Sequence, residues 1–591
     1  MKKSIKKSGQ NIIKKLSRAS QKTAEKSKEH VKKHIFRRIS NVRNVRLWVL
    51  EWLLLVTVVI LFSVIQNIWY RNSYETEVFV SGGGYSEGTL GTINSMNPLY
   101  ATTNSEKTLA KLMFSSLLAP DASGNLGNSL AKHVDVDATG KIWTVTLKDS
   151  VKWSDGEDLT AEDVVFTANL LKNPAAKTAV SVNFANVKIE NTDDYTVVFT
   201  LPTVYAAFTE TLDFPIVPEH ILGSVEPGLI YENAFSTSPV GSGPFTLNAL
   251  QKNSTGQTVY LNRNQSYFKG ETYLSTFTLR TYSSVDDIVT ALNRAEVNAS
   301  ADIGEISSED DVSAATIYER KTPLNGGVFA FLNTDSPVFG KTKVRQAVQR
   351  GIDMSIVRQG IVEDQAIDFP ILKRQMPNLT FPESPVYDKG AAARLFTEAG
   401  YTNTNNQLLD SEGNPVTISI SVLSTGVLPE IANRLSEQLT ALGFQVTVDE
   451  FVASEATQDF FTAIVRPRSY DILIYEIDLG IDADPFAYFA SAGAVETGMN
   501  LSNYRNSLVD DLLLSARTTM NGDLRKAKYE TFLKYWLNDA PAIGIYQSSL
   551  NYYYTKNTRI FSENSALTHA IDRFADVSDW ATEKSIRNRT P

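Results

Sequence analysis

The chain has 591 residues, of which 42% are hydrophobic and 21% are charged, a composition that is ordinary for a globular protein. A chain of this length is too long for one core, so two or three domains are expected. It has no cysteine, which excludes disulfide bonds, thiolate metal sites, cysteine nucleophiles and a lipid-modified N-terminal cysteine. Residues 1–46 hold 16 Lys or Arg and two acidic residues, and the remainder has a net charge of −23. This acidic body argues against a nucleic-acid partner, because phosphate binding requires clustered positive charge.

Residues 1–46 form a basic arm. We interpret this arm first as a topogenic tail without fixed structure. A patch that attracts anionic lipids is the second interpretation, and nucleic-acid binding is the third.

Residues 47–70 form an apolar run that is long enough to cross a bilayer of about 30 Å. Trp48 and Trp52 at one end, and Trp69 and Tyr70 at the other, are placed as interfacial anchors. The basic arm keeps the N-terminus in the cytoplasm, so the C-terminal body is expected outside a single-pass cell-membrane anchor. A cleaved signal peptide is the alternative, although signal cores are shorter and no clear A-x-A site follows.

Residues 71–84 read as a polar juxtamembrane linker. Further on, apolar residues alternate at 143, 145 and 147 and again at 195, 197, 199 and 201, which predicts two strands. Between them lies KDSVKWSDGEDLTAEDVVFTANLLKNP, residues 148–174. Here residues 151–153 are expected to end a strand, Thr160 to cap a helix with Asp163 reaching back, and Pro174 to stop that helix. Together these predict a small α+β insert over residues 119–215.

The second half alternates strands and helices. Strands are predicted at residues 416–422, 444–448 and 471–477, with a helix at 431–442 that Gly443 ends. Strand, helix and strand within some thirty residues form a βαβ unit, which implies parallel pairing. Two amphipathic helices, at 507–516 and 525–536, complete an α/β lobe.

A search for catalytic motifs gives none. The five histidines have no metal-ligand spacing, and neither H-E-x-x-H nor G-x-S-x-G is present. Gly340-Lys341-Thr342 lacks the earlier glycine of a P-loop, because that position is Asp335. We therefore predict a protein that is not an enzyme and has no cofactor or metal.

The segment 148–174 resembles the signature of the family 5 extracytoplasmic solute-binding proteins, the oligopeptide and dipeptide receptors of ABC importers. Seven further segments extend the resemblance in the family's order: SMNPLYATTNSEKTLAKLMFSSLL, IVPEHIL, SPVGSGPFTL, VRQAVQRGIDMSIV, YDKGAAARLFTEAGY, DADPFAYF and LNDAPAIGIY. The resemblance covers nearly all of the chain after residue 90.

The resemblance implies an α/β fold of the two-lobed periplasmic-binding-protein type II, with an extra α+β subdomain, preceded here by one transmembrane helix. Two chain crossings near residues 322–333 and 536–547 would join the lobes around a ligand cleft. The expected division is 1–46 arm, 47–70 anchor, 71–84 linker, 85–118, 216–325 and 540–591 lobe I, 119–215 subdomain, and 326–539 lobe II.

The resemblance also implies where the ligand lies. Peptide receptors of this family place an aspartate shortly before the Asp484-Pro485 pair, against the ligand's α-amino group. The register is ambiguous, since Ile481 occupies the expected position; Asp478 is slightly favoured and Asp482 is the alternative. The expected backbone contacts that pair with an extended peptide are Tyr475, Glu476 and Ile477, and Ala101, Thr102, Thr103 and Asn104.

The function that follows is capture of an oligopeptide outside the cell by hinge closure of the lobes, and its delivery to ABC permease subunits. Three alternatives remain open. In the first, the ligand is a non-peptide solute such as a nickel chelate, a sugar or an opine. In the second, the protein is a peptide-signal receptor. In the third, it is a surface hydrolase, which the missing nucleophile and base disfavour.

Overall fold

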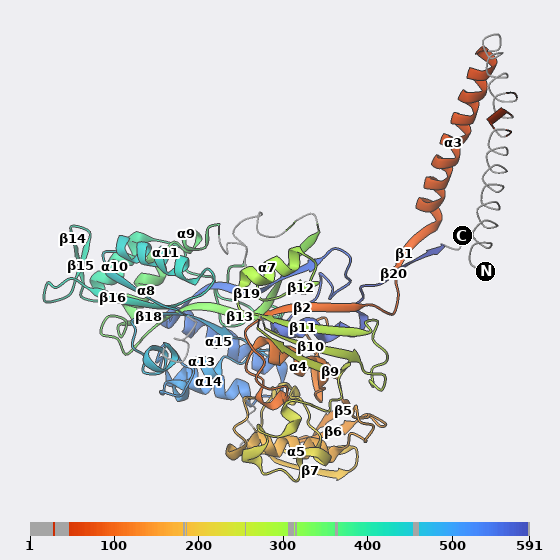
Figure 1. Ribbon diagram of the computed structural model, residues 1–591. Helices are drawn as coiled ribbons and strands as arrows, with labels where there is room; N and C mark the ends of the chain where they lie inside the picture. The colour runs from red at the N-terminus through yellow and green to blue at the C-terminus, as the bar shows by residue number, and fades with distance from the viewer. Residues whose placement is uncertain are drawn as a thin grey trace, which may run out of the picture. The chain divides into compact units, whose positions relative to one another are not determined.

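The computed structural model describes residues 46–588, with internal gaps at 181–183, 185, 255, 305–312, 314–315, 361–364 and 453–459. It also describes residues 26, 28, 29 and 33. The chain forms two compact units. One contains the described residues up to Val78 and those from Lys584, and the other is Phe79–Glu583 (Figure 1). The interpretations of the basic arm lie almost wholly outside the described residues.

The first unit is built on the apolar run. Helix α3 spans Arg46–Tyr74, and its segment Trp48–Arg71, with a mean hydropathy of 2.5, is apolar enough to cross a membrane. None of that segment is buried in protein, as a lipid-facing helix or a signal sequence requires. The predicted linker at 71–84 is wrong in part, because α3 continues through Tyr74 and strand β1 (Glu75–Phe79) follows it. β1 pairs with the last strand, β20 (Lys584–Asn588), which brings an acidic strand beside a basic one.

The second unit contains a ten-stranded sheet with the strand order β17-β16-β18-β13-β19-β12-β2-β11-β10-β9. Its strands are β2 (Gly84–Leu90), β9 (Phe245–Asn253), β10 (Gly256–Arg263), β11 (Thr276–Tyr282), β12 (Ala299–Ser300), β13 (Ile317–Leu332), β16 (Thr417–Ser424), β17 (Gln445–Val452), β18 (Ile472–Asp478) and β19 (Ala542–Thr555). β13 and β19 are the longest strands and pair antiparallel through the middle of the sheet (Figure 1).

A separate four-stranded sheet lies within the range predicted as the insert. It has the order β5-β6-β8-β7, formed by β5 (Ala131–Val136), β6 (Ile142–Leu147), β7 (Lys188–Asp193) and β8 (Thr196–Thr200). Two small hairpins add β3 (Leu118–Pro120) with β4 (Leu126–Asn128), and β14 (Thr402–Thr404) with β15 (Gln407–Leu409).

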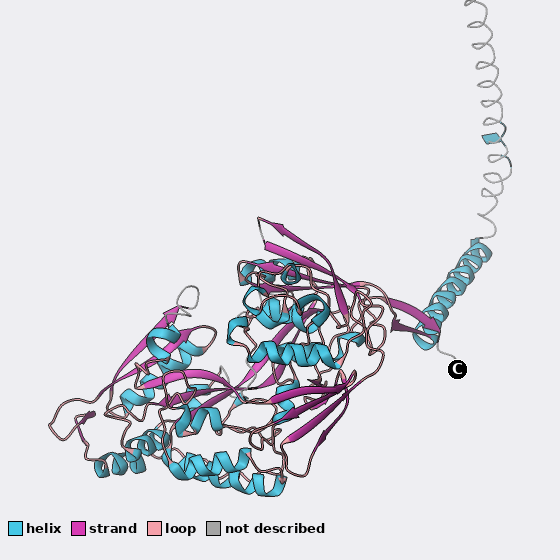
Figure 2. Ribbon diagram, turned by 90° about the horizontal axis from the view of Figure 1, so that it is seen from below, coloured by secondary structure: helices cyan, strands magenta, loops and turns pink. Residues whose placement is uncertain are grey.

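The helices of the second unit are mixed with its strands (Figure 2), and around β18 they pack against both faces of the ten-stranded sheet. They are α4 (Asn104–Met113), α5 (Ala161–Lys172), α6 (Glu219–Leu222), α7 (Val285–Asn293), α8 (Thr342–Gly351), α9 (Met354–Arg358), α10 (Lys389–Glu398), α11 (Leu428–Ala441), α13 (Phe486–Phe489), α14 (Ser507–Arg517) and α15 (Gly522–Asp539).

The local predictions for α5 and its surroundings have a mixed outcome. Thr160 and Asp163 form the predicted capping box, and the helix ends two residues before Pro174. The strand expected to end at residues 151–153 is wrong: β6 ends at Leu147, and only Lys152 makes an isolated bridge, to Asp158. The predicted βαβ unit is confirmed, since β16 and β17 pair parallel on either side of α11.

Candidate functional site

The two faces of strand β18 pack in two different apolar cores. Ile472 and Ile474 pack in one apolar core with residues of α8, α10 and α11, while Leu473 and Ile477 pack in another with residues of α14 and α15. Because side chains alternate along a strand, Glu476 and Asp478 continue the face of Ile474 beyond the end of its core. Two carboxylates therefore lie just beyond the end of this apolar core.

One edge of β18 is only partly paired. On the β13 side, the ladder runs from Ile472 to Asp478. On the β16 side, pairing stops at Ile474, so within the described residues no ladder partner continues along Tyr475–Asp478. The Asp478 carbonyl is nevertheless occupied, because it accepts a hydrogen bond from the Tyr488 hydroxyl at 2.6 Å. The pairing of Tyr475, Glu476 and Ile477 with an extended peptide stays a prediction, and the Ile477 side chain is buried in the core.

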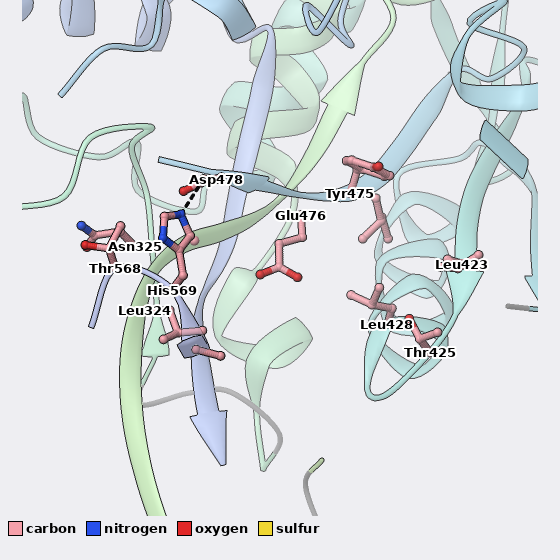
Figure 3. Close-up of a pocket in the computed structure, with 13 residues that line it drawn as sticks. Leu324, Asn325, Leu423, Thr425, Leu428, Tyr475, Glu476, Asp478, Thr568 and His569 are labelled. Carbon is pink, nitrogen blue, oxygen red and sulfur yellow. Dashed lines mark hydrogen bonds and ion pairs between the residues drawn. The ribbon is translucent and has the colours of Figure 1, made fainter. Parts of the chain in front are cut away.

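A cavity of about 450 Å³ lies along this edge (Figure 3). One wall is apolar, formed by Leu423, Leu428 and Ile474 from β16, α11 and β18. The opposite side is lined by Thr568–Ala570 and by residues 324–326 of β13. The β13–β19 register is irregular between Pro323 and Gly327 and again between Val328 and Phe329, so residues 324–326 form a bulge in this ladder.

Asp478 is already held by a cation. Its Oδ2 lies 2.8 Å from Nε2 of His569, whose Nδ1 lies 3.4 Å from Asp572 Oδ2. Burial raises the pKa of the Asp478 carboxyl, but the hydrogen bond and charge of His569 outweigh it, so this pKa lies below its usual value. Burial lowers the pKa of His569, and its hydrogen bonds to Asp478 and Asp572 reverse this and raise the pKa to about 10. The imidazolium therefore joins β18 to the C-terminal part of the chain at neutral pH.

Asp482 is paired as well. Both of its carboxylate oxygens accept hydrogen bonds from the Arg525 guanidinium of α15, and Asp484 accepts one from Arg517 of α14 at 2.8 Å. Asp482 lines a separate cavity of about 300 Å³ with Glu210. Burial first, and then the negative charge of Asp482, raises the pKa of the Glu210 carboxyl to about 8.

The second expected contact zone is largely bonded within itself. Thr103 caps α4, and the amides of Thr102 and Thr103 donate to Glu106 Oε2 at 2.9 and 3.1 Å. Ala101 lies just before them in extended conformation. The Asn104 side chain donates to Asp302 and lines a second cavity of about 450 Å³, which shares Leu324, His569 and Ala570 with the first. The two zones thus border adjoining cavities that meet at His569.

The residues that face β18 across the cavity, chiefly Thr568, His569 and Ala570, were not predicted from the sequence. His569 lies 91 positions after Asp478, and no local pattern connects them. The available signal was the rarity of histidine in the chain. Within the described part of the chain, no group of three or more His, Cys, Asp or Glu residues is arranged to hold a metal ion.

Comparison with known proteins agrees with this architecture. The model of bacterial extracellular solute-binding proteins, family 5 (middle), matches residues 125–497. The oligopeptide-binding protein AppA of Bacillus subtilis (strain 168) is 26% identical over 481 residues, which cover 79% of this chain and 86% of AppA.

Solved structures show the same fold. AppA from Bacillus subtilis in complex with a nonapeptide has a TM-score of 0.68 at 22% identity, covering 86% of this chain and all of AppA. NikZ from Campylobacter jejuni in complex with Ni(L-His) has a TM-score of 0.70 at 22% identity, covering 84% of this chain and 99% of NikZ. The fold class predicted from the sequence is confirmed, and the chain belongs to the family 5 extracellular solute-binding proteins of ABC transporters.

Proposed function

We propose that this protein is the membrane-anchored, extracytoplasmic substrate-binding protein of an ABC importer, and that it captures oligopeptides for its permease. The observation that carries the proposal is the edge of β18 at Tyr475–Ile477, which has no ladder partner on the β16 side among the described residues, beside a cavity of about 450 Å³. An extended peptide added to such an edge gains main-chain hydrogen bonds whatever its sequence, while pockets accept its side chains. The cavity volume is within the range of ligand sites.

The bulge of β13 supports the proposed hinge closure. Residues 324–326 interrupt the β13–β19 ladder at the point where they line the cavity. A few residues at such an irregularity can absorb backbone changes while the paired strands on either side stay intact. Closure around a bound peptide is therefore expected to pivot here.

The anchor is part of the same proposal. Helix α3 offers a 24-residue apolar span, directly after a basic arm that would remain in the cytoplasm. An anchored receptor stays near its permease without the lipid-modified cysteine that this chain lacks.

A non-peptide solute is the second candidate. It is supported by the fold shared with NikZ, whose structure holds Ni(L-His). The apolar wall formed by Leu423, Leu428 and Ile474 favours peptide side chains over a compact chelate, sugar or opine.

The test is to purify the full-length protein in detergent and identify the ligands it releases on denaturation by mass spectrometry. We expect a mixture of oligopeptides. Added peptides should raise the melting temperature by mass action. At a peptide concentration of 100 times Kd, the free energy of unfolding should increase by about 2.7 kcal/mol. Release of a single metal chelate, sugar or opine, with no stabilisation by any peptide, would replace the peptide assignment by the second candidate.

A further inference from the structure

The carboxylates around the cleft differ in whether they already have a cation. Asp478 has His569 at 2.8 Å, and Asp482 has the Arg525 guanidinium. Glu476 lines the first cavity together with Asp478, and among the described residues no cation or hydrogen-bond donor contacts its carboxylate. Figure 3 shows this side chain projecting into the space between Leu324 on one side and Tyr475 and Leu428 on the other.

The surroundings of Glu476 keep it directed into the cavity. Gly326 on the paired strand β13 has no side chain, and a Cβ there would lie 3.0 Å from Glu476 Oε1. The carboxylate therefore lies against bare backbone. Glu476 is exposed, so its carboxylate is open to a ligand that enters the cavity, where Leu423, Leu428 and Ile474 form an apolar wall.

His569 also determines where a ligand cation can bind. Residues two apart on one face of a strand are separated by about 7 Å, so Glu476 and Asp478 are distinct sites. A cation brought to Asp478 would meet the positive imidazolium already there, since its pKa is raised to about 10. A cation brought to Glu476 gains an unpaired carboxylate and avoids that repulsion.

We propose that Glu476, and not Asp478 or Asp482, receives the positive group of the ligand, so that the receptor selects peptides carrying an ammonium or guanidinium group at that point. The inference rests on the proposed function and names the specificity of that same site. The cation is either the peptide's α-ammonium or a Lys or Arg side chain. Because the β16-side edge of β18 at Tyr475–Ile477 includes residue 476, a peptide paired along β18 presents either group within reach.

The test measures binding of three pentapeptides to the full-length protein in detergent: free-amine penta-alanine, N-acetylated penta-alanine, and an N-acetylated peptide with a central lysine. The wild-type protein should bind at least one cationic peptide about 10- to 100-fold more tightly than acetylated penta-alanine, the range of a hydrogen bond to a charged group. The peptide that shows the preference identifies its source as the terminus or the side chain.

Glu476→Gln should abolish this preference while leaving acetylated penta-alanine unchanged, and Glu476→Ala should do the same. Glu496→Gln, at an exposed glutamate outside the cavity, is the matched control and should retain the preference. Asp478→Asn should retain it too. A preference that survives Glu476→Gln, or that disappears in Asp478→Asn instead, would overturn the proposal. Peptide binding with no charge preference would overturn it and leave the proposed function standing, whereas no binding of any peptide would overturn both.

Discussion

At the scale of single residues, the ion pair of Arg573 and Glu87 is almost completely buried, with side chains 5% and 2% exposed. Arg573 donates to Glu87 of β2, and Tyr552 of β19 donates to the same carboxylate at 2.8 Å. Burial raises the pKa of Glu87, and the positive charge of Arg573 counters only part of that effect. A pair so fully removed from water is costly to break, because the remaining charge has nowhere to be solvated.

Arg573→Met should lower the free energy of unfolding by about 3–5 kcal/mol, because it leaves the Glu87 carboxylate buried without its cation. Equilibrium urea unfolding, followed by tryptophan fluorescence, measures the loss. The double variant Glu87→Gln/Arg573→Met should recover much of it. Equal losses in the single and double variants would show that the packing of the Arg573 side chain, and not its charge, is what matters.

The ion pair of His569 predicts a specific dependence of stability on pH. Its pKa is about 10 in the folded protein and about 6.5 when unfolded, so the stabilisation is complete below pH 6.5 and is lost as pH rises through 10. On the acid side, the pKa values of Asp478 and Asp572 are lowered, so their contribution is lost as pH falls below about 3.9. The melting temperature of wild type should therefore exceed that of His569→Gln near neutrality, and the difference should shrink towards pH 10. A difference that stays constant between pH 6 and pH 10 would contradict the assigned ion pair.

At the scale of elements, helix α5 depends on its first turn. The Thr160 side chain accepts from the Glu162 amide, and Asp163 accepts from the Thr160 amide at 2.9 Å. Thr160→Ala removes one of these caps and should destabilise the turn by about 1 kcal/mol. Hydrogen exchange of the amides at the start of the helix should become about fivefold faster. Thr160→Ser keeps the hydroxyl and should exchange like wild type; equally fast exchange in both variants would exclude the cap as the cause.

The elements that the sequence predicted are those set by local chemistry. The capping box of α5, the alternating Trp143, Val145 and Leu147 of β6, and the parallel pairing of β16 and β17 all follow from residues close in sequence. The bulge in β13 was not predictable, because a ladder irregularity depends on its partner more than 200 residues away.

The candidate site divides in the same way. The β18 residues 475–478 could be placed at the end of a buried strand from their pattern alone. The cations that neutralise Asp478 and Asp482 could not, because His569 and Arg525 reach them only through tertiary packing, 91 and 43 positions away. The proposed role of Glu476 follows from this pairing of the two aspartates.

At the scale of the whole molecule, topology is the property to test. Protease added to intact cells should degrade the body and leave the basic arm with α3, because 16 positive charges precede an apolar span of 24 residues. Epitope tags at each terminus, read by immunoblot, distinguish the two fragments. A mature N-terminus located after residue 70 would instead identify α3 as a cleaved signal.

The pairing of β1 with β20 has a consequence for synthesis. β1 follows α3 directly and is made early, but its partner is translated only after about 500 more residues. Until then β1 lacks the strand with which it pairs, and an unpaired strand edge is open to association with another chain. The two-stranded ladder therefore forms only in a chain whose synthesis has reached β20.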